Sequence, residues 1–335
     1  MDYEFLLWLQ DLRDGFFGGA LDDFGNWLCN LNVSPWPLMA AALVYWLINK
    51  RGGCYWFMNF ALSYLVNVLI KLSFCVYRPW FIDSRIQPAG NLKSTTSGYS
   101  FPSGHATLAL SIYGPLSVWQ WKSRKWLSIL AVVPILLTLF YRNFLGVHTP
   151  QDVVVGLICT IVTMFLNYKL FEYLEKKNKK AHTITLLITF AASILIWLYI
   201  TFKPYPMDYI DGKIIADPAK GIADGYECLG MLLGFFIAWF IERHYVNFEV
   251  PNINIKKSKK AILVILFAII ATVPVYFIHQ NLGAAISPFV GSLWAKFIPK
   301  FSEFIYILVI VPIIYNLITI RKVKNPIVTK ERNHE

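Results

Sequence analysis

Apolar residues run along the chain in long stretches separated by short polar segments, and these stretches predict membrane-spanning helices. A helix needs about 20 mostly apolar residues to cross the hydrocarbon core of a bilayer. The first stretch is short for a crossing and has Pro35 and Pro37 at its start. The pattern predicts an all-α, polytopic membrane helix bundle. The nine predicted spans are 34–49, 54–75, 103–121, 126–144, 151–171, 183–202, 223–241, 261–279 and 302–320.

The N-terminal segment 1–33 has a different pattern, because it alternates Phe, Leu and Trp with acidic residues. This pattern is typical of an amphipathic segment lying at the membrane surface. Six acids against one base there, Arg13, argue against a cleavable signal peptide, which begins with basic residues. A lysine run at 176–180 divides the spans into two groups. The expected parts are an interfacial segment 1–33, a membrane core 34–175, additional transmembrane helices 183–320 and a cytoplasmic tail 321–335.

Composition supports a membrane protein and excludes other classes. Hydrophobic residues make up 56% of the 335 residues and charged residues only 15%, with a mean hydropathy of +0.50. Soluble domains average about 25% charged residues. These values exclude a disordered chain, a coiled coil and a small disulfide scaffold. The five cysteines are scattered without metal-ligand or disulfide spacing, so they indicate neither.

The net charge of +11 would suggest a nucleic-acid partner in a soluble protein, but here the position of the bases decides. Most basic residues fall in the loops on one side of the predicted spans, and most acids fall on the other. The positive-inside rule assigns the basic side to the cytoplasm. We therefore expect an integral plasma membrane protein with its N-terminus outside and its C-terminus inside. Nucleic-acid binding is not expected.

Three polar motifs lie at span ends where ionisable residues are costly and usually functional. In the topology above, all three meet at the outer face. Each motif alone also has an ordinary structural interpretation: a snorkelling lysine, a helix N-cap or a capping box. The motifs are Lys71 with Arg78-Pro79, then Gly98 to His105, and then Tyr141-Arg142 with His148 to Asp152.

Together the motifs supply what phosphoryl transfer needs. Lys71, Arg78 and Arg142 provide three fixed cations for the oxygens of a phosphate. Ser103 and Gly104 begin a predicted helix, where free N–H groups and the helix dipole favour an anion. A phosphate-binding site is therefore expected at these five residues.

Two histidines can divide the acid and base work. Asp152 follows His148 by four residues, one helical turn, and can hold one ring nitrogen so that the other points at phosphorus. His105 has no acid beside it in the sequence and suits protonation of the leaving oxygen. The motifs contain no carboxylate cluster for a divalent metal, so we expect no metal and no cofactor.

These residues resemble the three-part signature of the type 2 phosphatidic acid phosphatase superfamily, which includes vanadium haloperoxidases. The family pattern is K-x6-RP, then PSGH, then SR-x5-H-x3-D. The chain has Lys71-x6-Arg78-Pro79, Pro102-Ser103-Gly104-His105 and Arg142-x5-His148-x3-Asp152, so every spacing fits. It departs from the pattern at Tyr141, where the family usually has serine. The resemblance covers about 54–171 and is to a bacterial integral-membrane member.

The resemblance implies a six-helix phosphatase core followed here by extra C-terminal spans. It implies that His148 attacks phosphorus to form a phosphohistidine, with Asp152 as its partner, while His105 protonates the leaving alkoxide. Water then releases phosphate without a metal. Lys71, Arg78, Ser103, Gly104 and Arg142 would hold the phosphoryl group of a lipid substrate that enters from the outer leaflet.

The function expected from the sequence is hydrolysis of a lipid phosphomonoester or pyrophosphate. Candidate lipids are phosphatidate, phosphatidylglycerophosphate, a sphingoid-base phosphate and a polyprenyl pyrophosphate. Two alternatives stay open: phosphotransfer to an acceptor alcohol, and a lipid-phosphate binding or transport protein without catalysis. The loop from Lys203 to Ile222 either covers the site or simply connects two helices. Gly230 and Gly234 have the spacing that allows close helix packing.

Overall fold

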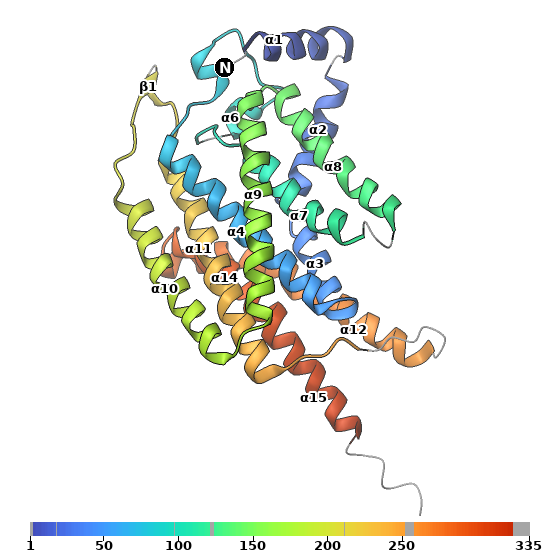
Figure 1. Cartoon of the computed structure of the whole chain (residues 1–335). Helices are drawn as coiled ribbons and strands as arrows, with labels where there is room; N and C mark the ends of the chain where they lie inside the picture. The colour runs from blue at the N-terminus through green and yellow to red at the C-terminus, as the bar shows by residue number, and fades with distance from the viewer. Residues whose placement is uncertain are drawn as a thin grey trace, which may run out of the picture.

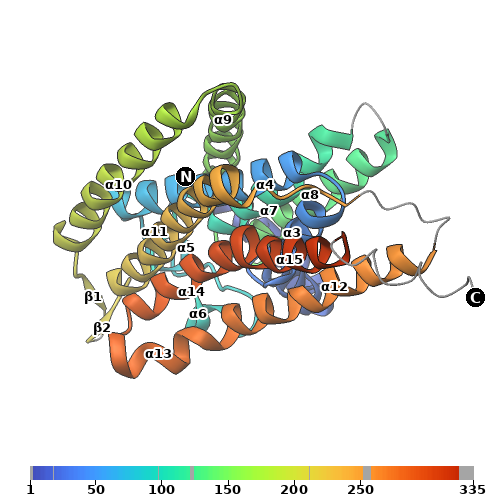
Figure 2. The same cartoon turned by 90° about the horizontal axis from the view of Figure 1, so that it is seen from below.

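The computed structural model describes residues 3–17, 19–96, 98–120, 124–210, 212–251 and 258–323. These residues are almost entirely helical and contain one two-stranded antiparallel hairpin. Helix α9 runs along the length of the bundle and α1 lies across one end (Figure 1), whereas α12 lies across the direction of α9 (Figure 2). The predicted all-α class is confirmed.

The first helices are α1 (Tyr3–Leu12), α2 (Ala20–Leu31), α3 (Trp36–Leu47), α4 (Lys50–Phe74), α5 (Pro79–Ile82), α6 (Leu92–Thr95), α7 (Gly104–Gln120), α8 (Lys125–Phe144), α9 (Pro150–Glu175) and α10 (Lys179–Phe202). The hairpin strands β1 (Tyr209–Ile210) and β2 (Lys213–Ile214) follow. The remaining helices are α11 (Pro218–Ile241), α12 (Ser258–Phe277), α13 (Gly283–Val290), α14 (Trp294–Ile305) and α15 (Val311–Val323). Single π-helical turns occupy Arg13–Phe17, Glu242–Val246, Ile278–Leu282 and Tyr306–Ile310.

Seven helical segments among the described residues are long and apolar enough to cross a membrane. They correspond to seven of the nine predicted spans. The predicted span 34–49 is wrong as a full crossing, because α3 has 12 residues and is therefore only about 18 Å long. The described part of α7 has 17 residues. The seven segments are Lys50–Ile82, Lys125–Phe144, Pro150–Glu175, Lys179–Phe202, Pro218–Val246, Ile262–Val290 and Trp294–Ile318.

Large apolar side chains cover the outer faces of these helices. On α10, Leu187, Ile188 and Leu195 are each more than 60% exposed. A soluble protein rarely exposes a continuous apolar face, whereas hydrocarbon is the natural surrounding for one. The chain is a multi-pass membrane protein.

Polar side chains at the helix starts explain where several spans begin. The Asn49 side chain accepts a hydrogen bond from the Gly52 amide at the start of α4, and Asn178 does the same at α10. At α9, Thr149 and Asp152 form a reciprocal capping box with Pro150 in the first turn. Each cap satisfies amide groups that a helix start would otherwise leave unpaired.

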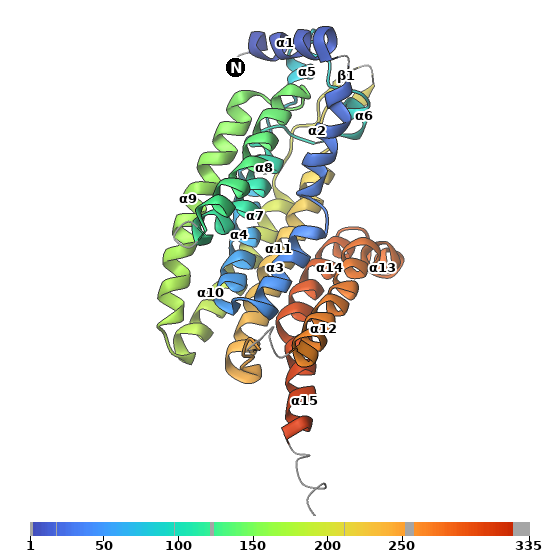
Figure 3. The ribbon, with the colours of Figure 1, turned by 90° about the vertical axis from the view of Figure 1, so that its right-hand side faces the viewer.

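Charged loops gather at the end of the bundle opposite to α1. Lys50 at the start of α4 pairs with Glu242 after α11 at 2.6 Å. Arg51 pairs with Glu172 near the end of α9, and Arg243 pairs with Glu175. The three motifs lie at the other end, beside α5 and α6 (Figure 3). The motifs therefore share one end, as predicted; the membrane side of that end stays a prediction.

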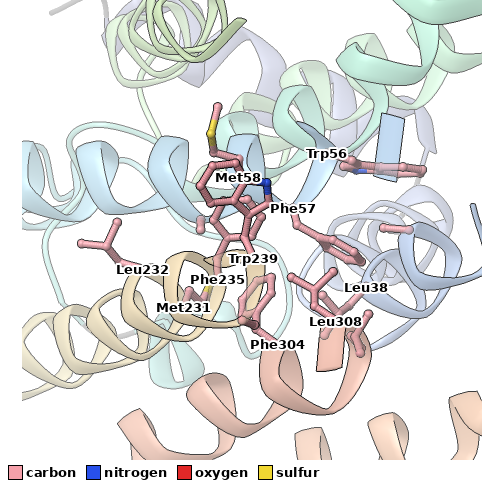
Figure 4. Close-up of a cluster of buried hydrophobic side chains, with 14 of the residues drawn as sticks. Leu38, Trp56, Phe57, Met58, Met231, Leu232, Phe235, Trp239, Phe304 and Leu308 are labelled. Carbon is pink, nitrogen blue, oxygen red and sulfur yellow. The ribbon is translucent and has the colours of Figure 1, made fainter. Parts of the chain in front are cut away.

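The C-terminal helices pack against the core through α11. Figures 2 and 3 show α12 to α15 along one side of the bundle, opposite to α9. A Cβ atom on Gly230 would lie 2.3 Å from the Phe297 carbonyl oxygen, and one on Gly234 would lie 2.8 Å from that of Phe301. The close packing predicted at these glycines is therefore present between α11 and α14. Beneath it, aromatic side chains from α4, α11 and α14 fill the core (Figure 4).

Candidate active site

One cavity of about 550 Å³ collects the three motifs. Two predicted residues lie directly behind its wall: the Ser103 amide donates to the Asp152 carbonyl oxygen at 2.9 Å, which ties the start of α7 to the start of α9. The structure thus brings all eight predicted site residues together. The other six line the cavity: Lys71, Arg78, Gly104, His105, Arg142 and His148.

The His148 ring lies between a carboxylate and a guanidinium. Its Nδ1 is 3.3 Å from Asp152 Oδ2, and its Nε2 is 3.1 Å from Arg78 Nη1. A guanidinium can only donate, so Nε2 must accept and the ring proton lies on Nδ1, facing the carboxylate. The lone pair of Nε2 is therefore directed toward the cationic side of the site.

The surroundings of His148 also keep the ring neutral. Burial, reinforced by the positive charges of Arg78, Arg142 and Lys71, holds the pKa of His148 well below its usual 6.5. Both causes disfavour the charged imidazolium. A neutral imidazole is the form that can act as a nucleophile.

Asp152 serves both functions considered for it from the sequence, helix capping and histidine binding. Its Oδ2 accepts from the Thr149 amide at 2.8 Å and from Ser100 Oγ at 2.6 Å, in addition to facing His148. Ser100 was not predicted as a site residue. It belongs to the loop before α7, and only the folded path of that loop brings it to Asp152.

Lys71 uses its donors to hold the loop that precedes α7. Its Nζ lies 3.2 Å from the carbonyl oxygens of Tyr99 and Ser100 and 2.8 Å from that of Pro102. An ammonium has three donors, and these carbonyls account for all three. Lys71 therefore supplies positive charge to the cavity while fixing the loop.

The two arginines differ in how their donors are used. Arg78 donates to the carbonyl oxygens of Val147 at 2.8 Å and Gly98 at 3.3 Å, which fixes its guanidinium beside His148. Arg142 is 3% exposed, and its Nε has no hydrogen-bond partner among the described residues. The same is true of Ser103 Oγ, which is fully buried.

The three cations of the site have no direct carboxylate partner in the part of the chain that the structure describes. Among the described residues, Lys71, Arg78 and Arg142 form no ion pair with a carboxylate. Buried charges and donors are costly unless something pairs with them. A tetrahedral anion with several oxygens would satisfy the three cations and the orphaned donors together, so the arrangement suits a phosphoryl group.

Tyr141, which replaces the usual family serine, does not line the cavity. Its ring packs against Phe140 and Phe144 and against the backbone of Gly25 in α2. A Cβ on Gly25 would lie 2.2 Å from the Tyr141 ring. Tyr141 therefore docks α2 on α8, and α2 in turn contributes two asparagines, Asn26 and Asn30, to the cavity wall.

Asn67 is a further residue that sequence reasoning missed. It lies one helical turn before Lys71 on α4 and lines the cavity. Its Nδ2 donates to the Ser103 carbonyl oxygen at 3.3 Å and to Thr107 Oγ1 at 2.9 Å. The four-residue spacing from Lys71 puts both side chains on one helix face, and that spacing was the available signal.

The loop between α10 and α11 lies against the site. Tyr77, one residue before Arg78, donates to the Asp208 carboxylate, and Tyr99 OH lies 3.5 Å from the Pro206 carbonyl oxygen. Lys220, in the first turn of α11, lines the cavity. The loop is thus more than a connector, although Tyr205 bonds only to Ile200 at its own base. The other two residues singled out in the loop are Tyr209 in β1, which is exposed, and Lys213 in β2.

In the described part of the chain, no group of three or more His, Cys, Asp or Glu side chains is placed to hold a metal ion. The cationic side chains are the positive groups that this cavity presents. Independence from metal stays a prediction that an assay must test.

Comparison with known proteins supports the resemblance. Residues 52–176 match the PAP2 superfamily. An undecaprenyl-diphosphatase of Sulfolobus acidocaldarius is 25% identical over 135 residues, which are 40% of this chain and 63% of that relative. The chain thus spans less than two thirds of the relative's length. No solved structure matches the chain. The PAP2 match is confined to residues 52–176, the segment that holds the three motifs.

Proposed function

We propose that this protein is a membrane phosphatase that hydrolyses a phosphomonoester or pyrophosphate of a lipid. The observation that carries the proposal is the meeting of a neutral, oriented His148 with three cations that form no ion pair among the described residues, around one cavity. A pocket that only bound phosphate would need the cations. It would not need a histidine with its lone pair directed among them.

In the proposed mechanism, His148 Nε2 attacks phosphorus as the bond to the leaving oxygen breaks. Asp152 stabilises the positive charge that develops on the ring, and His105 gives its proton to the leaving oxygen. Arg78, Arg142, Ser103 and the amide of Gly104 balance the charge on the phosphoryl oxygens. A water molecule, deprotonated by His105, then cleaves the phosphohistidine and releases phosphate.

The proposed substrate side is the outer leaflet. The site lies at the end of the bundle opposite to Lys50, Arg51 and Arg243, whose charges indicate the cytoplasmic side. The C-terminus is then cytoplasmic. A lipid substrate could present its phosphate to the cavity from the adjoining leaflet. The matched relative is named an undecaprenyl-diphosphatase, so a polyprenyl diphosphate is one substrate to test.

The test is release of inorganic phosphate by purified protein from a panel of lipid phosphates, with and without a metal chelator. We expect activity in both conditions. His148→Ala should lower turnover by at least about 10³-fold, the scale for loss of a covalent nucleophile. His244→Ala is the matched control, because His244 contacts His182 at the other end of the bundle.

Each outcome decides between functions. Free phosphate supports hydrolysis, whereas a phosphorylated acceptor lipid would identify a phosphotransferase. Undiminished turnover in His148→Ala would refute the phosphohistidine mechanism. Lipid-phosphate binding without turnover of any lipid in the panel would identify a binding protein.

A further inference from the structure

We infer that the α11 side of the cavity selects the substrate: it recognises lipid phosphates whose headgroup carries hydrogen-bond donors, hydroxyl or ammonium, beside the phosphate. The inference rests on the proposed function and names its substrate class. The residues that carry it are Asp224 on α11 and Asn67 on α4, which line the cavity together with the cations. Asp224 lies outside the segment 52–176 that matches the family.

Asp224 presents a carboxylate to the cavity without a contact partner. It makes no hydrogen bond or ion pair with any described residue, although Lys71, Lys220 and Lys296 act on its charge through space. The next acid on α11 differs, because Glu227 pairs with Lys296 at 3.3 Å. An ionised group inside a membrane bundle is costly and is usually kept for a partner or a substrate. Asp224 is therefore a free acceptor in the cavity wall.

Asn67 presents a second free acceptor. Because its Nδ2 donates to the Ser103 carbonyl, which can only accept, the amide orientation is fixed and Oδ1 points the other way. Asn67 is only 2% exposed, and its Oδ1 has no partner among the described residues. A Cβ on Gly104 would lie 3.7 Å from this oxygen, so it adjoins the start of α7 where the phosphate would bind.

These acceptors do not suit the phosphate itself. An anionic phosphoryl oxygen cannot donate to a carboxylate or an amide oxygen, and a plain hydrocarbon next to the phosphate would leave both unpaired. An acceptor that loses its water to a bound lipid without gaining a hydrogen bond weakens the binding of that lipid. A hydroxyl or ammonium group on the headgroup would satisfy them while the cations hold the phosphate. The cavity thus offers hydrogen-bond donors to the phosphate and hydrogen-bond acceptors to the headgroup hydroxyl or ammonium beside it.

The test compares three single-chain lipids that differ in the donors beside the phosphate. Hexadecyl phosphate has none, palmitoyl lysophosphatidate has one hydroxyl, and sphinganine 1-phosphate has a hydroxyl and an ammonium. We expect kcat/KM at least about tenfold higher for the two donor-bearing lipids, because a site with fixed hydrogen-bonding groups rejects analogues that leave them unpaired. A larger gain for sphinganine 1-phosphate would identify the ammonium as the preferred donor.

Asp224→Asn should reduce this advantage at least about fivefold, the lower limit for losing a charge-assisted hydrogen bond. Glu249→Gln is the matched control, because that exposed carboxylate follows α11 outside the cavity and should leave the advantage unchanged. Native mass spectrometry of the three lipids bound to the His148→Ala variant measures the same preference without turnover.

The results separate this inference from the proposed function. Equal kcat/KM for the three wild-type reactions, or an equal loss with all three lipids in Asp224→Asn, would overturn the inference and leave the phosphatase intact. If no lipid is hydrolysed, the phosphatase fails, and binding then decides: preference for the donor-bearing lipids, lost in Asp224→Asn, supports the inference, and equal binding overturns it.

Discussion

Replacing Asp152 with asparagine separates the charge of this residue from its shape. One carboxylate oxygen accepts three donors, from Ser100, Thr149 and His148. An asparagine can place its amide oxygen in the same position and keep all three hydrogen bonds as neutral ones. The tautomer of His148 should also survive, because Arg78 donates to Nε2 whatever occupies position 152. The substitution therefore removes charge and little else.

The size of the effect follows from these contacts. A hydrogen bond to a charged group contributes about 1.5–3 kcal/mol and a neutral one about 0.5–1.5, so the bond to His148 loses about 1–1.5 kcal/mol. His148 becomes positive as it attacks phosphorus, so losing the negative charge of Asp152 raises the barrier by a similar further amount. Together these are about 2–3 kcal/mol, and at about 1.4 kcal/mol per factor of ten Asp152→Asn should slow turnover about 30- to 140-fold. KM should change little, since the groups proposed to hold the phosphate are untouched.

The assay is steady-state phosphate release from the best lipid substrate, with thermal unfolding measured on the same samples. Asp217→Asn is the control, because Asp217 is an exposed helix N-cap outside the cavity and asparagine caps equally well. A loss of about 10⁴-fold, the scale of a wrong tautomer in a serine protease triad, would refute the orienting role of Arg78. A loss below about twofold would refute the role of the carboxylate charge.

Two further predictions concern the support and the ionisation of the site. Gly25→Ala should destabilise the protein by about 1–3 kcal/mol and lower activity, because the new methyl would overlap the Tyr141 ring that docks α2. Thermal unfolding measures this loss, and Gly15→Ala, whose new methyl would meet open space, is the control that should show none. Adding Tyr141→Ser to Gly25→Ala should restore stability. His148 should stay neutral at pH 6, since its pKa is held well below 6.5 by burial and the nearby cations, and stability should fall as acid protonates the unfolded chain below pH 6.5. NMR of histidine-labelled protein, assigned with His148→Gln, tests this, and a titration at or above pH 6.5 would contradict it.

Much of the fold and of the site could be predicted from the sequence, because the signals are local. The helical spans follow from runs of apolar residues whose length a bilayer fixes, and Thr149, Pro150 and Asp152 mark the start of α9 within four residues. His148 and Asp152 meet because one helical turn separates them. The length of α3 was harder to predict, since the apolar pattern of 34–49 continues beyond the helix that forms.

The rest of the site depends on contacts between distant segments. Ser100 reaches Asp152 only because Lys71 holds the intervening loop by its carbonyl groups. Tyr141 departs from the family pattern, and its ring packs against Gly25, 116 residues earlier in the chain. Asp224 gave no signal at all, since a lone acid near a helix start is common. Such residues can be identified as part of the site only from the packed arrangement of the helices.

The distribution of the cavity wall over the chain suggests how its chemistry and its selectivity are divided. His105, His148 and the three motif cations all lie within 52–176, the segment that matches the PAP2 superfamily. The wall is completed by Asn26 and Asn30 from α2 and by Asp224 from α11, both outside that segment. α11 is in turn fixed by its glycine contacts with α14. The added C-terminal helices thus have a physical role in the site: they hold α11 against the cavity, where a change of side chain would alter the accepted headgroup without disturbing the groups proposed to cleave it.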